Sequence, residues 1–139
     1  KRIMDIQIFN WAAVFSTAFL SIVFLQSGID KILNYKQELG WIQQKFVRNA
    51  LYNYVGIMFF FLTLFEVASG VLSACGVLAI LGGFSNSLAI AGAWLSTLTL
   101  LMLIFGQRVS KDYSGSASLV PYFIASLLAL YFLSLNPIA

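Results

Sequence analysis

The amino-acid sequence predicts an all-α membrane protein, with four transmembrane helices in an antiparallel bundle and a short amphipathic interfacial helix between the first two. Of the 139 residues, 60% are hydrophobic and only 9% are charged, and the mean hydropathy is +0.90. A soluble domain is usually about half apolar, so this composition favours a lipid environment. The apolar residues also form long blocks between polar connections, as membrane spans do. We therefore expect a single membrane domain over residues 1–139.

The four expected spans cover about residues 8–27, 54–81, 87–106 and 117–135. An α-helix needs about 20 residues to cross a hydrocarbon core of roughly 30 Å. The first span ends at Ser27 and Gly28, and the turn-forming run Gly82–Ser87 separates the second from the third. Pro121 falls in the first turns of the fourth span, where its missing N–H matters least. An even number of spans places both termini on the same side of the membrane.

The connection between the first two spans, residues 34–53, has a different pattern. Its apolar residues Leu39, Ile42 and Phe46 recur at helical spacing, while most polar residues fall elsewhere. This pattern predicts a short amphipathic helix in the membrane interface, with Trp41 at headgroup level. The alternative is a solvated loop.

The charges bear on partners and topology. The net charge is +3, and the cations lie in the connections rather than in a basic run. Such a balance in a membrane chain reflects topology and lipid headgroups, so we expect the lipid bilayer and no nucleic acid as a partner. The positive-inside rule, taken literally, places the two charged connections in the cytoplasm. Because several of these cations can have structural roles, the orientation stays open.

The composition also restricts the chemistry. The chain has no histidine and one cysteine, Cys75, so haem or zinc ligation by histidine and an intramolecular disulfide are excluded. No residue is predicted to be catalytic or to bind a metal. Cys75 lies in the small-residue run Ser73–Gly76, which predicts a buried packing role. Small residues four apart, such as Ala89 and Ala93, predict close helix contacts.

Glu66 is the most informative residue of the sequence. It is the only charged residue between Asn49 and Gln107, and it lies well inside the second span. An acid at the centre of a membrane helix costs roughly 2.5–3.5 kcal/mol on insertion scales unless another group offsets it. We therefore expect a cation from an adjoining connection to reach Glu66, since long basic side chains extend along apolar surface.

Antiparallel spans bring the polar residues of two connections to the same membrane face as the start of the second span. The predicted polar network consists of Asp30, Lys31, Glu66, Arg108, Lys111, Asp112 and Tyr113. We expect Glu66 to pair with Arg108 or Lys31, with Arg108 favoured for its forked donors, and Asp112 to brace Arg108 at i,i+4 spacing. Two interpretations stay open: the network lines a small cavity for a quinone head, a proton or a lipid, or it is an ion-pair clamp that fixes the helix register.

Three motifs, in order, resemble the DoxX/DoxD-like family of four-helix integral membrane proteins. They are Phe24–Lys31 (FLQSGIDK), Phe65–Gly70 (FEVASG) and Phe105–Gly115 (FGQRVSKDYSG). The third is most similar to versions found in Bacteroidetes-type bacteria. The resemblance implies a multi-pass protein of the bacterial inner membrane that partners with other subunits of a redox or respiratory complex. The missing ligand set and thiol pair set this chain apart from four-helix relatives that carry out redox chemistry themselves.

Two functional hypotheses follow. In the first, the chain is a non-catalytic accessory subunit of a quinone-linked redox complex, and its Glu-Arg-Asp network fixes the bundle or lines a small quinone or lipid pocket. In the second, it is a stand-alone membrane protein that binds or transports a lipid or another small hydrophobic molecule. No covalently bound or metal-ligated cofactor is expected in either case; a quinone or a lipid is the expected ligand.

Overall fold

The computed structural model describes the backbone of residues 2–135 and the side chains of residues 11–135. The described chain is almost entirely helical, which confirms the all-α membrane fold. In chain order the elements are α1 (Arg2–Leu33), α2 (Tyr35–Lys45), the 3-10 turn η1 (Tyr52–Tyr54), α3 (Val55–Leu81), α4 (Ser87–Val109), α5 (Tyr113–Ser118) and α6 (Val120–Leu135).

Four stretches of the described chain are long and apolar enough to cross a membrane. They are Trp11–Leu33, Tyr52–Leu81, Ser87–Val109 and Tyr113–Leu135. The first helix does not stop at Ser27 and Gly28 as expected but continues to Leu33. The fourth span consists of α5 and α6, and Pro121 lies in the first turn of α6.

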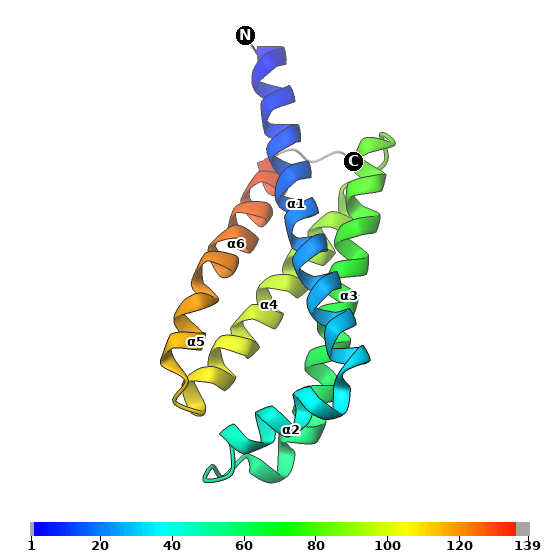
Figure 1. Ribbon diagram of the computed structural model, residues 1–139. Helices are drawn as coiled ribbons and strands as arrows, with labels where there is room; N and C mark the ends of the chain where they lie inside the picture. Colours follow the sequence, from blue (N-terminus) through cyan, green and yellow to red (C-terminus); the bar gives the residue numbers. More distant parts are fainter. Residues whose placement is uncertain (1, 136–139) are drawn as a thin grey trace.

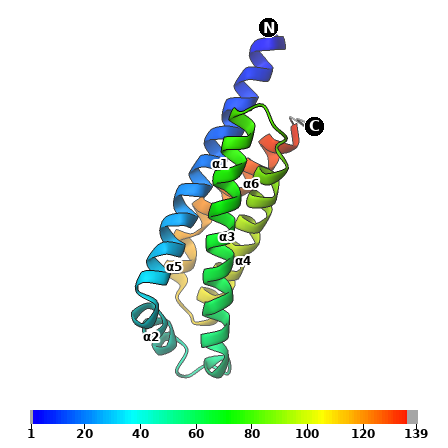
Figure 2. The ribbon, with the colours of Figure 1, turned by 90° about the vertical axis from the view of Figure 1, so that its right-hand side faces the viewer.

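The long helices form a bundle in which α3 packs between α1 and α4, and α6 packs against both α4 and α1 (Figures 1 and 2). Figure 1 shows that α1 begins and α6 ends at one end of the bundle. The helix α2 lies at the opposite end, beside the turn between α4 and α5. The amphipathic stretch is therefore helical over Tyr35–Lys45, and the chain continues through turns and η1 into α3.

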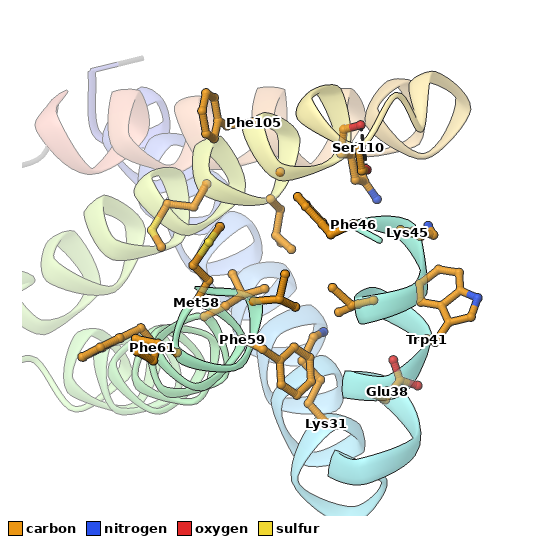
Figure 3. Close-up of a pocket in the computed structure, with 18 of the residues that line it drawn as sticks. Lys31, Glu38, Trp41, Lys45, Phe46, Met58, Phe59, Phe61, Phe105 and Ser110 are labelled. Carbon is orange, nitrogen blue, oxygen red and sulfur yellow. Dashed lines mark hydrogen bonds between the residues drawn. The ribbon is translucent and has the colours of Figure 1, made fainter. Parts of the chain in front are cut away.

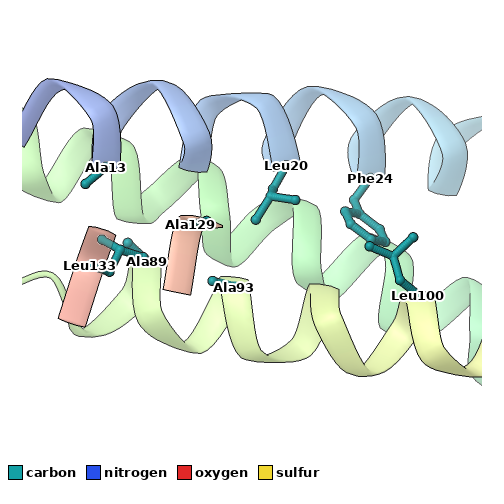
Figure 4. Packing of buried hydrophobic residues seen from close by; sticks show 8 residues of the cluster. All are labelled: Ala13, Leu20, Phe24, Ala89, Ala93, Leu100, Ala129 and Leu133. Atoms are coloured by element: carbon teal, nitrogen blue, oxygen red, sulfur yellow. The ribbon is translucent and has the colours of Figure 1, made fainter. Parts of the chain in front are cut away.

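The core between the helices is built from a few large and several small side chains (Figure 4). It contains Ala13, Leu20, Phe24, Ala89, Ala93, Leu100, Ala129 and Leu133. Large apolar residues such as Trp94 and Phe105 instead face outwards and are more than half exposed. An apolar exterior of this kind suits a lipid solvent, in which close packing rather than exclusion from water drives helix association.

Small residues set the contact between α3 and α4 near the turn that joins them. A Cβ atom added to Gly76 would lie 2.5 Å from the backbone of Ala89, and one added to Gly92 would lie 2.6 Å from the Ser73 Oγ. These two contacts define the antiparallel register of the pair and agree with the predicted packing role of Ala89. The expected burial of Cys75 is wrong: its neighbours Ser73 and Gly76 face α4, while Cys75 faces outwards.

Substitution of Gly76 tests the α3–α4 contact. We expect Gly76→Ala to lower the thermal stability in mild detergent, because its methyl group would meet the backbone of Ala89. Gly56→Ala is the matched control on α3, where an added Cβ meets nothing within 4 Å. A helical Gly→Ala change without a clash should stabilise by about 0.5–1 kcal/mol. Equal melting shifts for both variants would contradict the proposed packing.

Candidate functional site

Glu66 and Lys31 form an ion pair between α3 and α1. The Lys31 Nζ lies 3.0 Å from the Glu66 Oε2 and donates a hydrogen bond of 3.3 Å to the Oε1. It also donates to the Ser27 Oγ at 2.9 Å. The Glu66 side chain is only 1% exposed and that of Lys31 is 15% exposed. The Oε2 lies within ion-pair distance of the Lys31 Nζ but accepts no hydrogen bond from the described residues.

The pairing follows from the way α1 meets α3. Gly28 allows close approach, because an added Cβ would lie 2.7 Å from the Val67 side chain, next to Glu66 in sequence. Lys31 follows Gly28 by three residues on the same continuous helix, so it lies one turn further along the face that contacts α3. The continuation of α1 beyond Gly28 is therefore what brings the ammonium group to Glu66.

Of the two partners that the sequence suggested for Glu66, the structure selects Lys31, and the preference for Arg108 is wrong. The antiparallel register of α3 and α4 places Arg108 level with Ile57, nine residues or roughly 13 Å along the axis from Glu66. Arg108 is exposed, and its guanidinium carbon lies 4.7 Å from the centre of the Tyr113 ring. This cation–π contact is the observed role of Tyr113 within the described residues.

The expected brace between Asp112 and Arg108 is also wrong. It assumed a continuous helix, but α4 ends at Val109, and Lys111 has a left-handed backbone with φ of 63°. Asp112 instead pairs with Lys45 at the end of α2. It also caps α5 by accepting a hydrogen bond from the Gly115 N–H. The Lys45 ammonium and the Gly115 amide hold the pKa of Asp112 below its usual range.

The predicted network therefore divides into separate contacts at one end of the bundle. Asp30 and Lys111 are both exposed at that end, and the described residues include no ion pair for either. Lys45 was not among the predicted residues. Its position at the end of the amphipathic helix, at the same end of the bundle as the connection that holds Asp112, was the available signal.

A pocket of about 540 Å³ opens beside the charge pair, enclosed by α2, α3, α4 and the end of α1 (Figure 3). Aromatic, aliphatic and methionine side chains form most of its wall. The polar lining residues are Lys31, Glu38, Lys45, Gln107 and Ser110. Figure 3 shows Lys31 between α3 and α2. The Gln107 Oε1 is buried and has no hydrogen-bond partner among the described residues.

The pocket lies where α3 and α4 separate. Figure 1 shows the two helices diverging from their connecting turn towards α2. In the same register that pairs Gly76 with Ala89, the larger residues Leu62 and Leu103 stand opposite each other and line the pocket. The pocket therefore begins beside Glu66, at Phe65 and Lys31, and extends towards α2.

No family model matches this sequence, and no curated protein or solved structure matches it either. Within the part of the chain that the structure describes, no group of three or more histidine, cysteine or acidic residues could hold a metal ion. The resemblance to DoxX/DoxD-like proteins therefore stays a prediction.

Replacing the charge pair singly and together tests its energetics. We expect Lys31→Met to destabilise the bundle by about 3–5 kcal/mol, because it leaves the buried Glu66 carboxylate without a cation. Adding Glu66→Gln should recover most of that loss, since a neutral pair has no uncompensated charge. Unfolding in mild detergent gives the stability of Lys31→Met, of Glu66→Gln and of the double variant. Additive losses in the double variant would show that the two residues are not coupled.

The contact between Lys45 and Asp112 should depend on pH. Because the pKa of Asp112 is lowered in the folded protein, the contact contributes stability above the ordinary carboxyl pKa of about 3.9 and loses it as the pH falls through the lower folded value. The Lys45 Nζ lies 3.7 Å from the centre of the Trp41 ring, so Trp41 fluorescence reports on the release. We expect an acid transition below about pH 4. It should be absent in Asp112→Asn, and an unchanged transition there would exclude Asp112 as its source.

Proposed function

We propose that the protein is an accessory membrane subunit of a quinone-linked redox complex and that it holds a quinone-like amphiphile in the pocket beside Lys31. The observation that carries this proposal is the pocket itself: a mainly apolar cavity whose two lysines are ion-paired, formed between two membrane-spanning helices and covered by α2. Its volume, about 540 Å³, falls in the usual range for small-molecule sites.

The charges disfavour an anionic head group. The two lysines of the pocket wall are already neutralised, Lys31 by Glu66 and Lys45 by Asp112. Glu38 adds a carboxylate to the wall, and this carboxylate forms no ion pair with the described residues. An anionic phosphate would therefore meet no spare cation in the wall, whereas a neutral ring with polar oxygens needs none.

The hydrogen-bonding groups suit a ring with carbonyl or hydroxyl oxygens. An ammonium group has three N–H donors, and Lys31 uses two of them, one on Ser27 and one on Glu66, which leaves the third for a ligand oxygen. The unpartnered Oε1 of Gln107 can accept from a ligand hydroxyl. A quinone offers the acceptor and its reduced quinol the donor. The aromatic side chains Phe46 and Phe59 supply flat apolar surface for the ring.

An accessory role fits the composition. The chain has no histidine and a single cysteine, so the common protein ligands of haem and the thiol pairs of redox relays are missing from its sequence. Together with the resemblance to DoxX/DoxD-like proteins, this supports a subunit that positions a lipid-soluble carrier for a catalytic partner.

A stand-alone lipid-binding protein is the second candidate, favoured by the fact that one chain encloses the pocket. Native purification in mild detergent separates the two candidates. Co-migration with cytochrome or flavoprotein subunits supports the accessory role. A protein that travels alone with a bound lipid supports the second candidate.

Quinone binding can be measured through Trp41, which lines the pocket. In a Trp11→Phe/Trp94→Phe background it is the sole tryptophan, since the chain has three. The protein is placed in nanodiscs of neutral phospholipid and titrated with a decyl-benzoquinone, and we expect saturable quenching of Trp41 fluorescence. Quenching that rises linearly without saturation would indicate collisions in the bilayer and contradict a site.

Two glycine variants make the test specific. Gly106 lines the pocket, and an added Cβ there meets nothing within 4 Å. We expect Gly106→Leu to fill the cavity without disturbing the helix and to weaken binding by at least about tenfold, or 1.4 kcal/mol. Gly56→Leu is the matched control, because Gly56 has equally open surroundings on α3 and lies outside the pocket wall. Equal affinities for both variants would place the quinone elsewhere.

A further inference from the structure

The pocket is closed differently at the α2 end and on the side between α3 and α4. At the α2 end, polar contacts join α2 and the segment after it to α4 and the turn beyond it. Lys45 pairs with Asp112, and the Asn49 side-chain amide donates a hydrogen bond of 3.2 Å to the Val109 carbonyl. Phe46, between Lys45 and Asn49, is 5% exposed and lines the pocket. A ligand that entered from this end would have to break these contacts and displace a buried ring.

The side away from α2, between α3 and α4, is closed by apolar side chains alone. Met58 and Phe61 of α3 and Met102 and Phe105 of α4 line the pocket there, and we call these four residues the lateral portal. Phe61 is 46% exposed and Phe105 is 61% exposed, although both belong to the pocket wall. Figure 3 shows both rings on the side of the pocket away from α2. The pocket is therefore continuous with the outer surface of two membrane-spanning helices.

We infer that the ligand enters the pocket sideways from the bilayer through the lateral portal, and that its flexible apolar chain stays in the portal while its polar head lies at Lys31. This inference rests on the proposed function and adds the route and the class of ligand. The ligand is a membrane-dissolved molecule with a single long chain, rather than a water-soluble metabolite.

The chemistry of the portal supports this route. Methionine is unbranched and adapts its shape at low cost, so Met58 and Met102 can move aside for a chain. The exposed rings of Phe61 and Phe105 lie on the outer surface of membrane-spanning helices, and their rotation leaves no polar group without a partner. Passage through the portal therefore breaks no hydrogen bond or ion pair, in contrast to passage under α2.

A reversible bridge across the portal tests the route. Phe61→Cys and Phe105→Cys are introduced into the single-tryptophan protein with Cys75→Ala, which removes the only native cysteine. The two thiols are joined by a reducible bis-thiosulfonate reagent of graded length. The rate of Trp41 quenching by decyl-benzoquinone in nanodiscs is then measured before bridging, after bridging and after reduction. Each single-cysteine variant treated with the reagent controls for modification without a bridge.

We expect the bridge to slow both uptake and release of the quinone by at least about tenfold, equivalent to 1.36 kcal/mol in the barrier, and reduction to restore both rates. Asn49→Ala, which removes the hydrogen bond from Asn49 to the Val109 carbonyl at the α2 end, lies outside the pocket wall and should leave the rates within about twofold. Unchanged rates in the bridged protein, or faster uptake in Asn49→Ala, would overturn lateral entry in favour of the α2 end. A protein without saturable quenching before bridging would instead overturn the proposed function, and lateral entry with it.

Discussion

The ion pair between Lys31 and Glu66 is the constraint on which the arrangement of this bundle depends. In a lipid core, either charge alone would be strongly unfavourable, and the two groups compensate each other only when α1 and α3 meet in one register. Gly28 makes that register possible by bringing the helices together three residues before Lys31. Close packing and charge compensation therefore specify the same alignment, which makes neighbouring alignments unfavourable on both counts.

The pair also determines what the adjoining pocket can hold. Because Glu66 neutralises Lys31, the pocket meets a polar group without a net charge at that end. Without Glu66, the Lys31 ammonium would favour an anionic head group. The helix α2 can then cover the pocket without having to neutralise Lys31. Its own lysine, Lys45, forms a second pair with Asp112 near the surface.

The sequence was sufficient to predict the fold class, the approximate spans and a cationic partner for Glu66, because these depend on hydropathy and on the cost of a buried charge. It could not select Lys31 over Arg108, since the choice depends on the register between helices, which no single span encodes. The predicted contact between Asp112 and Arg108 is wrong for a local reason. The left-handed backbone at Lys111 ends the helical spacing that the prediction assumed. The contact with Lys45 joins two connections far apart in sequence, so hydropathy patterns do not reveal it.

The pocket follows from the uneven sizes of the residues along the contact between α3 and α4. Near their connecting turn the helices meet through glycine, alanine and serine, and their backbones approach closely. Beyond Glu66 the facing positions carry leucine and phenylalanine, and the helices diverge towards α2 (Figure 1). Two straight helices that touch at one end and are held apart at the other must enclose a wedge. The bulky residues line this wedge without filling it, and α2 covers its wide end, so the packing that closes one half of the bundle opens a cavity in the other.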